Sequence, residues 1–128
     1  MAIGRDTTAK NIKPLGGSVV RRYTAGAAIA AGEIVAMSSD GFIDPTDTTS
    51  AVSAVLGVAI QAASAAAEVI DVVVFGPVVC ITGGTPGAIC YASDTAGEPS
   101  ESAGSNLGVC GVVEAATIVF VNPVLAVA

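Results

Sequence analysis

The chain has 128 residues, enough for one domain of common size, and 52% of them are hydrophobic, which excludes a disordered protein. It contains no histidine, which excludes Ser-His-Asp and Cys-His catalysis, imidazole metal sites and histidine pH switches. Only 12% of the residues are charged, which indicates that part of the surface is buried against partners.

The net charge of −6 is distributed unevenly along the chain. All five basic residues fall in the first 22 positions, at Arg5, Lys10, Lys13, Arg21 and Arg22. Only Asp6 offsets them there, so residues 1–22 carry +4. Residues 23–128 contain ten acids and no base, so they carry −10 and cannot form salt bridges among themselves.

Residues 1–16 are mostly polar or small and show no periodic pattern, and Pro14 and Gly16-Gly17 mark their end. We therefore predict an extended basic N-terminal arm, not a structured element, followed by a single all-β domain over residues 17–128. The arm could bind nucleic acid, clamp an acidic protein surface or be a solvated tail. The acidic body would repel phosphate and no aromatic residues interleave the cations, so the protein surface is favoured.

The body is predicted to be all-β, because Val (19) and Ile (10) far outnumber Leu (4) and because Gly and Pro break the chain repeatedly. We expect seven to ten short strands in a small barrel- or sandwich-like domain, with helix below about 15% of residues. The expected strands cover residues 18–24, 33–37, 42–43, 52–60, 68–75, 78–81, 88–92, 107–113 and 117–121.

Turn residues set the boundaries between these strands. Asp40-Gly41 predicts a tight turn, and residues 44–47 a second turn or loop. Gly76-Pro77 is expected to end one strand, and residues 93–105 to form the longest loop of the body. The Ala-rich residues 61–67 fit either a single helical turn or a loop.

A faint internal repeat is visible in the sequence. Gly32-Glu33-Ile34 resembles Gly87-Ala88-Ile89, 55 residues later, and Leu56-Gly57-Val58 resembles Leu107-Gly108-Val109, 51 residues later. The two pairs indicate either a duplicated strand-turn-strand plan or chance in a chain rich in Ala, Gly and Val.

Three cysteines, Cys80, Cys90 and Cys110, lie among apolar residues. Their odd number and their spacing fit no zinc pattern and no closed disulfide framework. We predict three unpaired, buried thiols that react slowly in the native state, and a reducing compartment of synthesis.

No other pattern predicts chemistry. The Gly83–Gly87 loop lacks the lysine of a phosphate-binding loop, and no cofactor is expected. Asp40, Asp44 and Asp47 could hold a hard cation, but Asp residues in turns more often cap their own backbone. Residues 48–67 are uncharged but too rich in Ala, Ser and Thr for a membrane span, and no targeting segment is expected.

The order of motifs resembles the small capsid decoration (cement) proteins of tailed bacteriophages. The matching stretches cover most of residues 17–121: VVRRYTAGAAIAAGEIVAMSSDGFIDPTD, then VLGVAIQAASAAAEVIDVVVFGPV, then LGVCGVVEAATIVFV. The resemblance implies an all-β domain of the β-tulip type, as well as a homotrimer at three-fold sites of the expanded head, beside neighbouring decoration subunits. It also implies an arm lying over the major capsid protein on the outer surface of the virion. No enzymatic activity, nucleic acid or membrane partner is implied, and synthesis would take place in the host cytoplasm.

On this interpretation the residues expected to bind the capsid are Arg5, Lys10, Asn11, Lys13 and Pro14. The arm would be poorly ordered in the free protein, because little in it can join a core. Arg21 and Arg22 should point to opposite faces of a strand, one toward the arm or subunit interface and the other toward the acidic body.

Two other classes remain open. A structural or adhesive β-domain of a phage tail, fibre or cell-surface assembly also suits the Gly/Ala/Val composition. A small enzyme using carboxylates is the third and is disfavoured, since the chain lacks most catalytic side chains.

Overall fold

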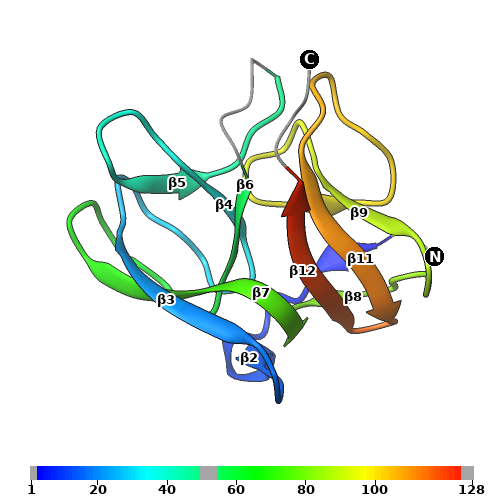
Figure 1. Cartoon of the computed structure of the whole chain (residues 1–128). Helices are drawn as coiled ribbons and strands as arrows, with labels where there is room; N and C mark the ends of the chain where they lie inside the picture. The colour runs from blue at the N-terminus through cyan, green and yellow to red at the C-terminus, as the bar shows by residue number, and fades with distance from the viewer. Residues whose placement is uncertain (1–2, 50–54, 125–128) are drawn as a thin grey trace.

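The computed structural model describes residues 3–49 and 55–124, and over these residues the chain is almost entirely β-strand (Figure 1). One three-residue 3-10 helix, Ala9–Asn11, interrupts the strands of the described residues. The all-β prediction is confirmed. The strands are β1 Gly4–Arg5, β2 Lys13–Pro14, β3 Val19–Thr24, β4 Ile34–Met37, β5 Ile43–Pro45, β6 Val55–Ala59, β7 Val69–Val79, β8 Ile81–Thr82, β9 Ile89–Ala92, β10 Pro99–Ser100, β11 Val109–Ala115 and β12 Ile118–Val124.

Most strands belong to one antiparallel sheet that curls on itself, in the order β10-β9-β11-β12-β7-β6-β4-β5 (Figure 1). β2 and β3 pair with β7 beside this path, and β1 pairs with β8 separately. The long strand β7 joins the two halves of the sheet. Its first part lies between β3 and β6, and its second part lies between β2 and β12.

β7 continues through Gly76-Pro77, so the prediction that this dipeptide ends a strand is wrong. Gly76 has φ 102°, and a Cβ there would lie 2.6 Å from the Cα of Ser18, so only glycine fits the bend. Pro77 lacks a donor, but its carbonyl accepts a hydrogen bond from the N–H of Leu15 at 3.0 Å. The dipeptide therefore redirects the strand from one half of the sheet to the other.

β7 contributes side chains to two cores, because successive residues of a strand point to opposite faces of the sheet. Ile70 and Val72 belong to the smaller core, whereas Val73 and Val78 belong to the larger one. The larger core also receives residues of β11 and β12, among them Val113, so it spans both halves of the sheet.

The two halves repeat one pattern of strand pairing. The order β5-β4-β6-β7 in one half matches β10-β9-β11-β12 in the other. The register matches as well, including the irregularity in each: the equivalent pairs are Ile34↔Val58 and Ile89↔Val112, Val35↔Gly57 and Cys90↔Gly111, Ala36↔Val55 and Tyr91↔Val109. The duplicated plan is therefore present, but Gly57 corresponds to Gly111 and not to Gly108.

Other sequence predictions are refined. Residues 61–67 form a loop, with Ala63 in a bridge to Ile29, and no helical turn. Asp44-Pro45 lies within β5, and the loop 93–105 contains the short strand β10. Of the expected strand 52–60, residues 52–54 lie outside the described part of the chain.

The N-terminal segment, residues 3–16, packs on the body. β1 pairs with β8, β2 pairs with the second part of β7, and the side chain of Ile12 lies in the larger core. The expectation that little in this segment joins the core is therefore wrong. Ile12, the partly buried Ile3 and two short strands suffice, because the edges of β7 and β8 offer free backbone partners.

The described residues contain no helix long and apolar enough to cross a lipid bilayer.

Candidate binding surface

Two of the five basic side chains are paired with carboxylates of the body. The Nε–H of Arg5 donates to Glu98 Oε2 at 2.7 Å, and its guanidinium also donates to the carbonyl of Ala31. Arg22 donates to Asp71 Oδ1 at 3.2 Å from the neighbouring strand. Arg5 therefore links the N-terminal residues to the acidic body, and Arg22 links β3 to it.

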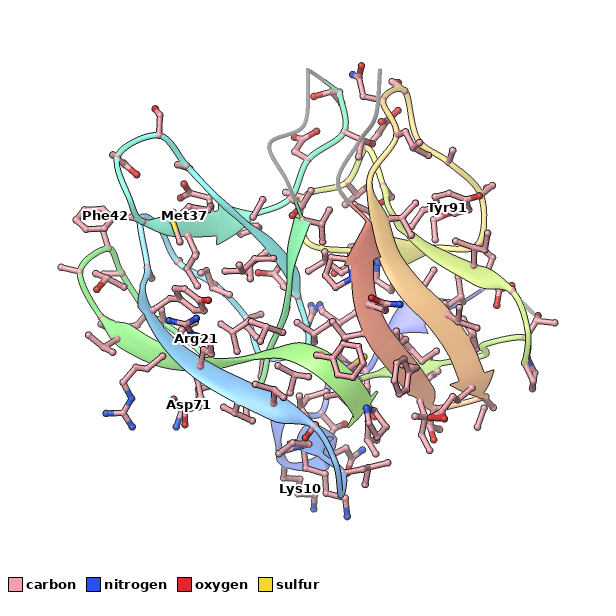
Figure 2. The ribbon with its side chains drawn as sticks, viewed as in Figure 1. Lys10, Arg21, Met37, Phe42, Asp71 and Tyr91 are labelled. Carbon is pink, nitrogen blue, oxygen red and sulfur yellow. The ribbon has the colours of Figure 1, made fainter. Side chains whose placement is uncertain are left out.

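Arg21 and Arg22 point to opposite faces of β3, as strand alternation predicts. Arg21 lies over the ring of Tyr23, two residues along the strand, at 5.8 Å from its centroid. Arg22 forms an ion pair with Asp71, so one of the two does meet the acidic body. Figure 2 labels Arg21 and Asp71.

Lys10 and Lys13 are exposed, and within the described residues neither makes an ion pair. Both line an open depression of about 350 Å³, together with Asp6, Asn11, Val79 and Thr117. The short helix carries Lys10, and β2 carries Lys13 beside Val79. The result is a local pair of cations on a chain whose net charge is negative.

Asp6 holds this region in place and was not expected from the sequence. The buried carboxylate accepts hydrogen bonds from the N–H of Thr8 at 2.9 Å and from Nδ2 of Asn11 at 3.1 Å. Asn11 is thereby committed to an internal contact. Pro14, in β2, is exposed, and it lies opposite Val78 of β7.

A second exposed surface lies next to the lysines, and sequence reasoning missed it. The sheet-face band consists of five apolar side chains on one face of β3, β7, β12, β11 and β9: Val19, Phe75, Phe120, Val112 and Ile89. Four of them are between 43% and 48% exposed, and Phe120 is half-buried.

Cross-strand contacts make the band continuous. Val19 lies opposite Phe75, the rings of Phe75 and Phe120 meet edge-to-face at 5.2 Å, and Val112 lies opposite both Phe120 and Ile89. Val79 lies opposite both Lys13 and Ile118, two residues before Phe120, so the band reaches the lysine depression. Residues 107–113 and 117–121 are almost continuous apolar runs, so no alternation in the sequence marks which of their side chains are exposed.

Two of the three acidic turn residues, Asp40 and Asp47, cap backbone, whereas Asp44 accepts a hydrogen bond from the hydroxyl of Ser38. Asp40 accepts from the N–H of Phe42 at 2.9 Å, and Asp47 accepts from the N–H and hydroxyl of Thr49. The backbone bond from Thr49 lowers the pKa of Asp47. No group of metal-ligating side chains occurs in residues 3–49 and 55–124.

Comparison of the chain with protein-family models and with curated proteins finds no match. The arrangement on the surface is therefore the basis for a functional assignment. Two exposed lysines next to an apolar face are suited to binding a protein surface that carries carboxylates.

Proposed function

We propose that the protein is a structural decoration (cement) protein of a tailed-phage head, without enzymatic activity. It would bind the outer surface of the expanded shell at three-fold sites as a homotrimer, with the major capsid protein as its partner. The order of motifs supports the family. One observation carries the binding role: Lys10 and Lys13, which make no ion pair within the described residues, lie next to the continuous, exposed sheet-face band.

The internal contacts narrow the set of capsid-binding residues. Arg5 is hydrogen-bonded to Glu98, and Asn11 to Asp6. Either side chain would have to break that hydrogen bond before it could contact the capsid. Lys10 and Lys13 have no such partner within the described residues, and we assign them the contact with shell carboxylates.

The proposed mechanism needs no chemistry. A subunit that binds only the expanded lattice stabilises that lattice by mass action. Each exposed ion pair contributes only about 0.2–1 kcal/mol, but three copies in one trimer add through avidity. Because exposed ion pairs are screened, binding should weaken as salt rises.

Cosedimentation with expanded shells tests the proposal. We expect the purified protein to pellet with expanded shells and not with unexpanded ones. The Lys10→Ala/Lys13→Ala variant should bind about tenfold or more weakly and with a smaller salt dependence. Arg22→Ala removes an exposed cation that is already paired internally, so it is the matched control and should bind as the wild type does.

The shells should come from the phage whose capsid gene neighbours the gene of this protein. Absence of cosedimentation would overturn the proposal and favour a tail, fibre or cell-surface role. Unchanged binding of the double lysine variant would overturn the assignment of the contact to Lys10 and Lys13.

A further inference from the structure

The first half of the sheet, β5-β4-β6-β7 with β3, lacks a strand that the second half has. By strand register, Val72 of β7 is equivalent to Val119 of β12. Arg21 of β3 pairs with Val72, and Val78 in the second part of β7 pairs with Val119, so β3 takes the place of that part of β7. The second part of β7 carries β2 on its other edge, whereas β3 pairs with β7 alone within the described part of the chain.

The outer edge of β3 presents backbone groups without a partner strand. The N–H of Ala25, just after β3, donates to the carbonyl of Glu68, just before β7, at 2.8 Å. Residues of an antiparallel ladder turn their backbone groups alternately toward and away from the partner strand, so those of Tyr23 and Arg21 face β7 and those of Arg22 face away. Such an edge is a template for a further strand.

The core of the first half is also covered less completely than that of the second. Three apolar residues of the larger core are at most 1% exposed: Ala92, Cys110 and Val121. Their register equivalents beside the smaller core are only partly buried: Met37, Leu56 and Val74. In the second half, the segment that forms β2 also places Ile12 in the larger core. A strand on β3 would give the smaller core an equivalent cover.

A cation lies where the further strand would add to the sheet. Arg21 is exposed, whereas Val78, its register equivalent, is fully buried. The guanidinium lies over Tyr23, which packs against the smaller core, and it forms no ion pair with a carboxylate in the described residues. Figure 2 shows Arg21 and Met37 at the same half of the sheet, apart from Lys10 in the view. A strand that adds here should therefore bring a carboxylate.

We propose that the outer edge of β3 binds an extended segment of another protein, in which an apolar side chain lies next to a carboxylate. The backbone edge at Arg22 supplies main-chain hydrogen bonds, the apolar side chain covers Tyr23, and the carboxylate pairs with Arg21. The N-terminal segment of a second copy does not suit the site, because the residue after its apolar Ile12 is the cation Lys13. A second β3 does not suit it either, since two arginines from each strand would meet.

This edge is distinct from the surface proposed for the shell, and binding there is a function beyond decoration. The shell contact involves Lys10, Lys13 and the sheet-face band, and Val19 is the one residue of β3 in that band. The two surfaces share no residue, so each can be altered without changing the other.

A peptide derived from the strand that covers the second half tests the site. The probe is a synthetic peptide of residues 9–16 carrying Lys10→Glu and Lys13→Glu, and its matched control is the same peptide with the native lysines. In a nuclear magnetic resonance titration of the full chain, we expect the acidic peptide to shift the Met37 methyl signal and the amide signals of β3. The native peptide should shift neither, and Met1, the other of the two methionines, is the internal reference.

Two substitutions at one position separate main-chain pairing from side-chain contact. Arg22→Pro removes an outward N–H of β3, whereas Arg22→Ala retains it, and both lose the same ion pair with Asp71. The acidic peptide should bind Arg22→Ala nearly as it binds the wild type, and it should not bind Arg22→Pro. Circular dichroism of each variant verifies that the β fold is retained.

A charge reversal tests the side-chain contact and does not depend on the proline variant. Arg21→Ala should bind the acidic peptide about threefold to fivefold more weakly, through loss of one exposed ion pair. Arg21→Glu leaves the backbone edge intact and should reverse the preference, binding the native peptide more tightly than the acidic one.

Equal binding of the two peptides, an acidic peptide that leaves Met37 and β3 unchanged, or unaltered binding by a folded Arg22→Pro variant would each overturn the site on β3. Arg21→Ala should still pellet with expanded shells as the wild type does, and loss of pelleting would overturn the separation of the two surfaces. A wild type that binds the acidic peptide but ignores shells would overturn the decoration role alone.

Discussion

At the scale of single residues, burial sets the chemistry of the three thiols. Cys80, Cys90 and Cys110 are all buried and unpaired, as the sequence predicted. Burial raises the pKa of Cys80 far above its ordinary value, and a hydrogen bond with Cys90, followed by burial, raises that of Cys110. The reactive thiolate is therefore scarce at Cys80 and Cys110, and all three sulfurs are inaccessible.

We expect all three thiols to react slowly with a maleimide in the native protein and rapidly in denaturant, as followed by mass spectrometry. Immediate labelling of the native protein would contradict the buried positions.

Glu33 makes stability depend on pH. Its side chain accepts a hydrogen bond from the N–H of Ala30 at 2.8 Å, near Arg5 and Glu98. Burial raises its pKa above 4.5, outweighing the lowering by the Ala30 bond and by Arg5. The folded state therefore favours the protonated form, so the stability that Glu33 contributes is complete below pH 4.5 and is lost as pH rises through the raised pKa.

Glu33→Gln stays neutral at every pH and retains an acceptor for Ala30. We expect its free energy of unfolding, relative to the wild type, to increase as pH rises from below 4.5 to neutrality, in urea titrations at a series of pH values. The same comparison for Glu114→Gln, an exposed carboxylate, is the control. A difference that stays constant or falls would contradict the burial effect.

At the scale of strands, the two halves of the sheet share a close backbone approach. A Cβ on Gly57 would collide with the carbonyl oxygen of Val73, and a Cβ on Gly111 with that of Phe120. The two contacts are equivalent. Gly57 lies in β6, which pairs with β7, and Gly111 lies in β11, which pairs with β12; β7 and β12 are neighbours in the middle of the sheet. In both cases the neighbour is backbone, which cannot rotate away.

We therefore expect Gly57→Ala and Gly111→Ala each to lower the free energy of unfolding by about 1–3 kcal/mol in urea titrations. Gly16→Ala meets no atom within 4 Å and should change it by less than about 0.5 kcal/mol. A loss at one strand glycine without the other would contradict the structural equivalence of the halves.

At the scale of the whole molecule, the N-terminal segment, residues 3–16, is an integral part of the fold of the acidic body. It supplies Ile12 to the larger core, two short strands, and the Arg5–Glu98 pair. Burial of a side chain like that of Ile12 contributes about 1.5–3 kcal/mol on its own. The same segment carries the exposed Lys10 and Lys13, so stability and proposed binding belong to different residues within it.

Deleting residues 1–16 should therefore lower the melting temperature markedly, whereas Lys10→Ala/Lys13→Ala should leave it near that of the wild type. Differential scanning calorimetry measures both. A truncated protein as stable as the full chain would contradict the packing of this segment.

Features of this protein that depend on local pattern could be predicted from its sequence. Val and Ile dominance with Gly and Pro breaks predicted an all-β chain, and the alternation of Arg21 and Arg22 predicted their opposite faces. The apolar neighbours of the cysteines predicted their burial. These inferences hold because side-chain period and burial preference depend on a few adjacent residues.

Features that depend on pairing between distant parts of the chain become visible only in the folded structure. Arg5 finds Glu98 93 positions away, Gly76-Pro77 bends β7 without ending it because β2, β3 and β12 pair around the bend, and Gly57 matches Gly111 only through strand register. The sheet-face band unites side chains of five strands that are scattered between Val19 and Phe120. Which strands become neighbours is set by long-range burial of the shared core, and no local segment encodes it.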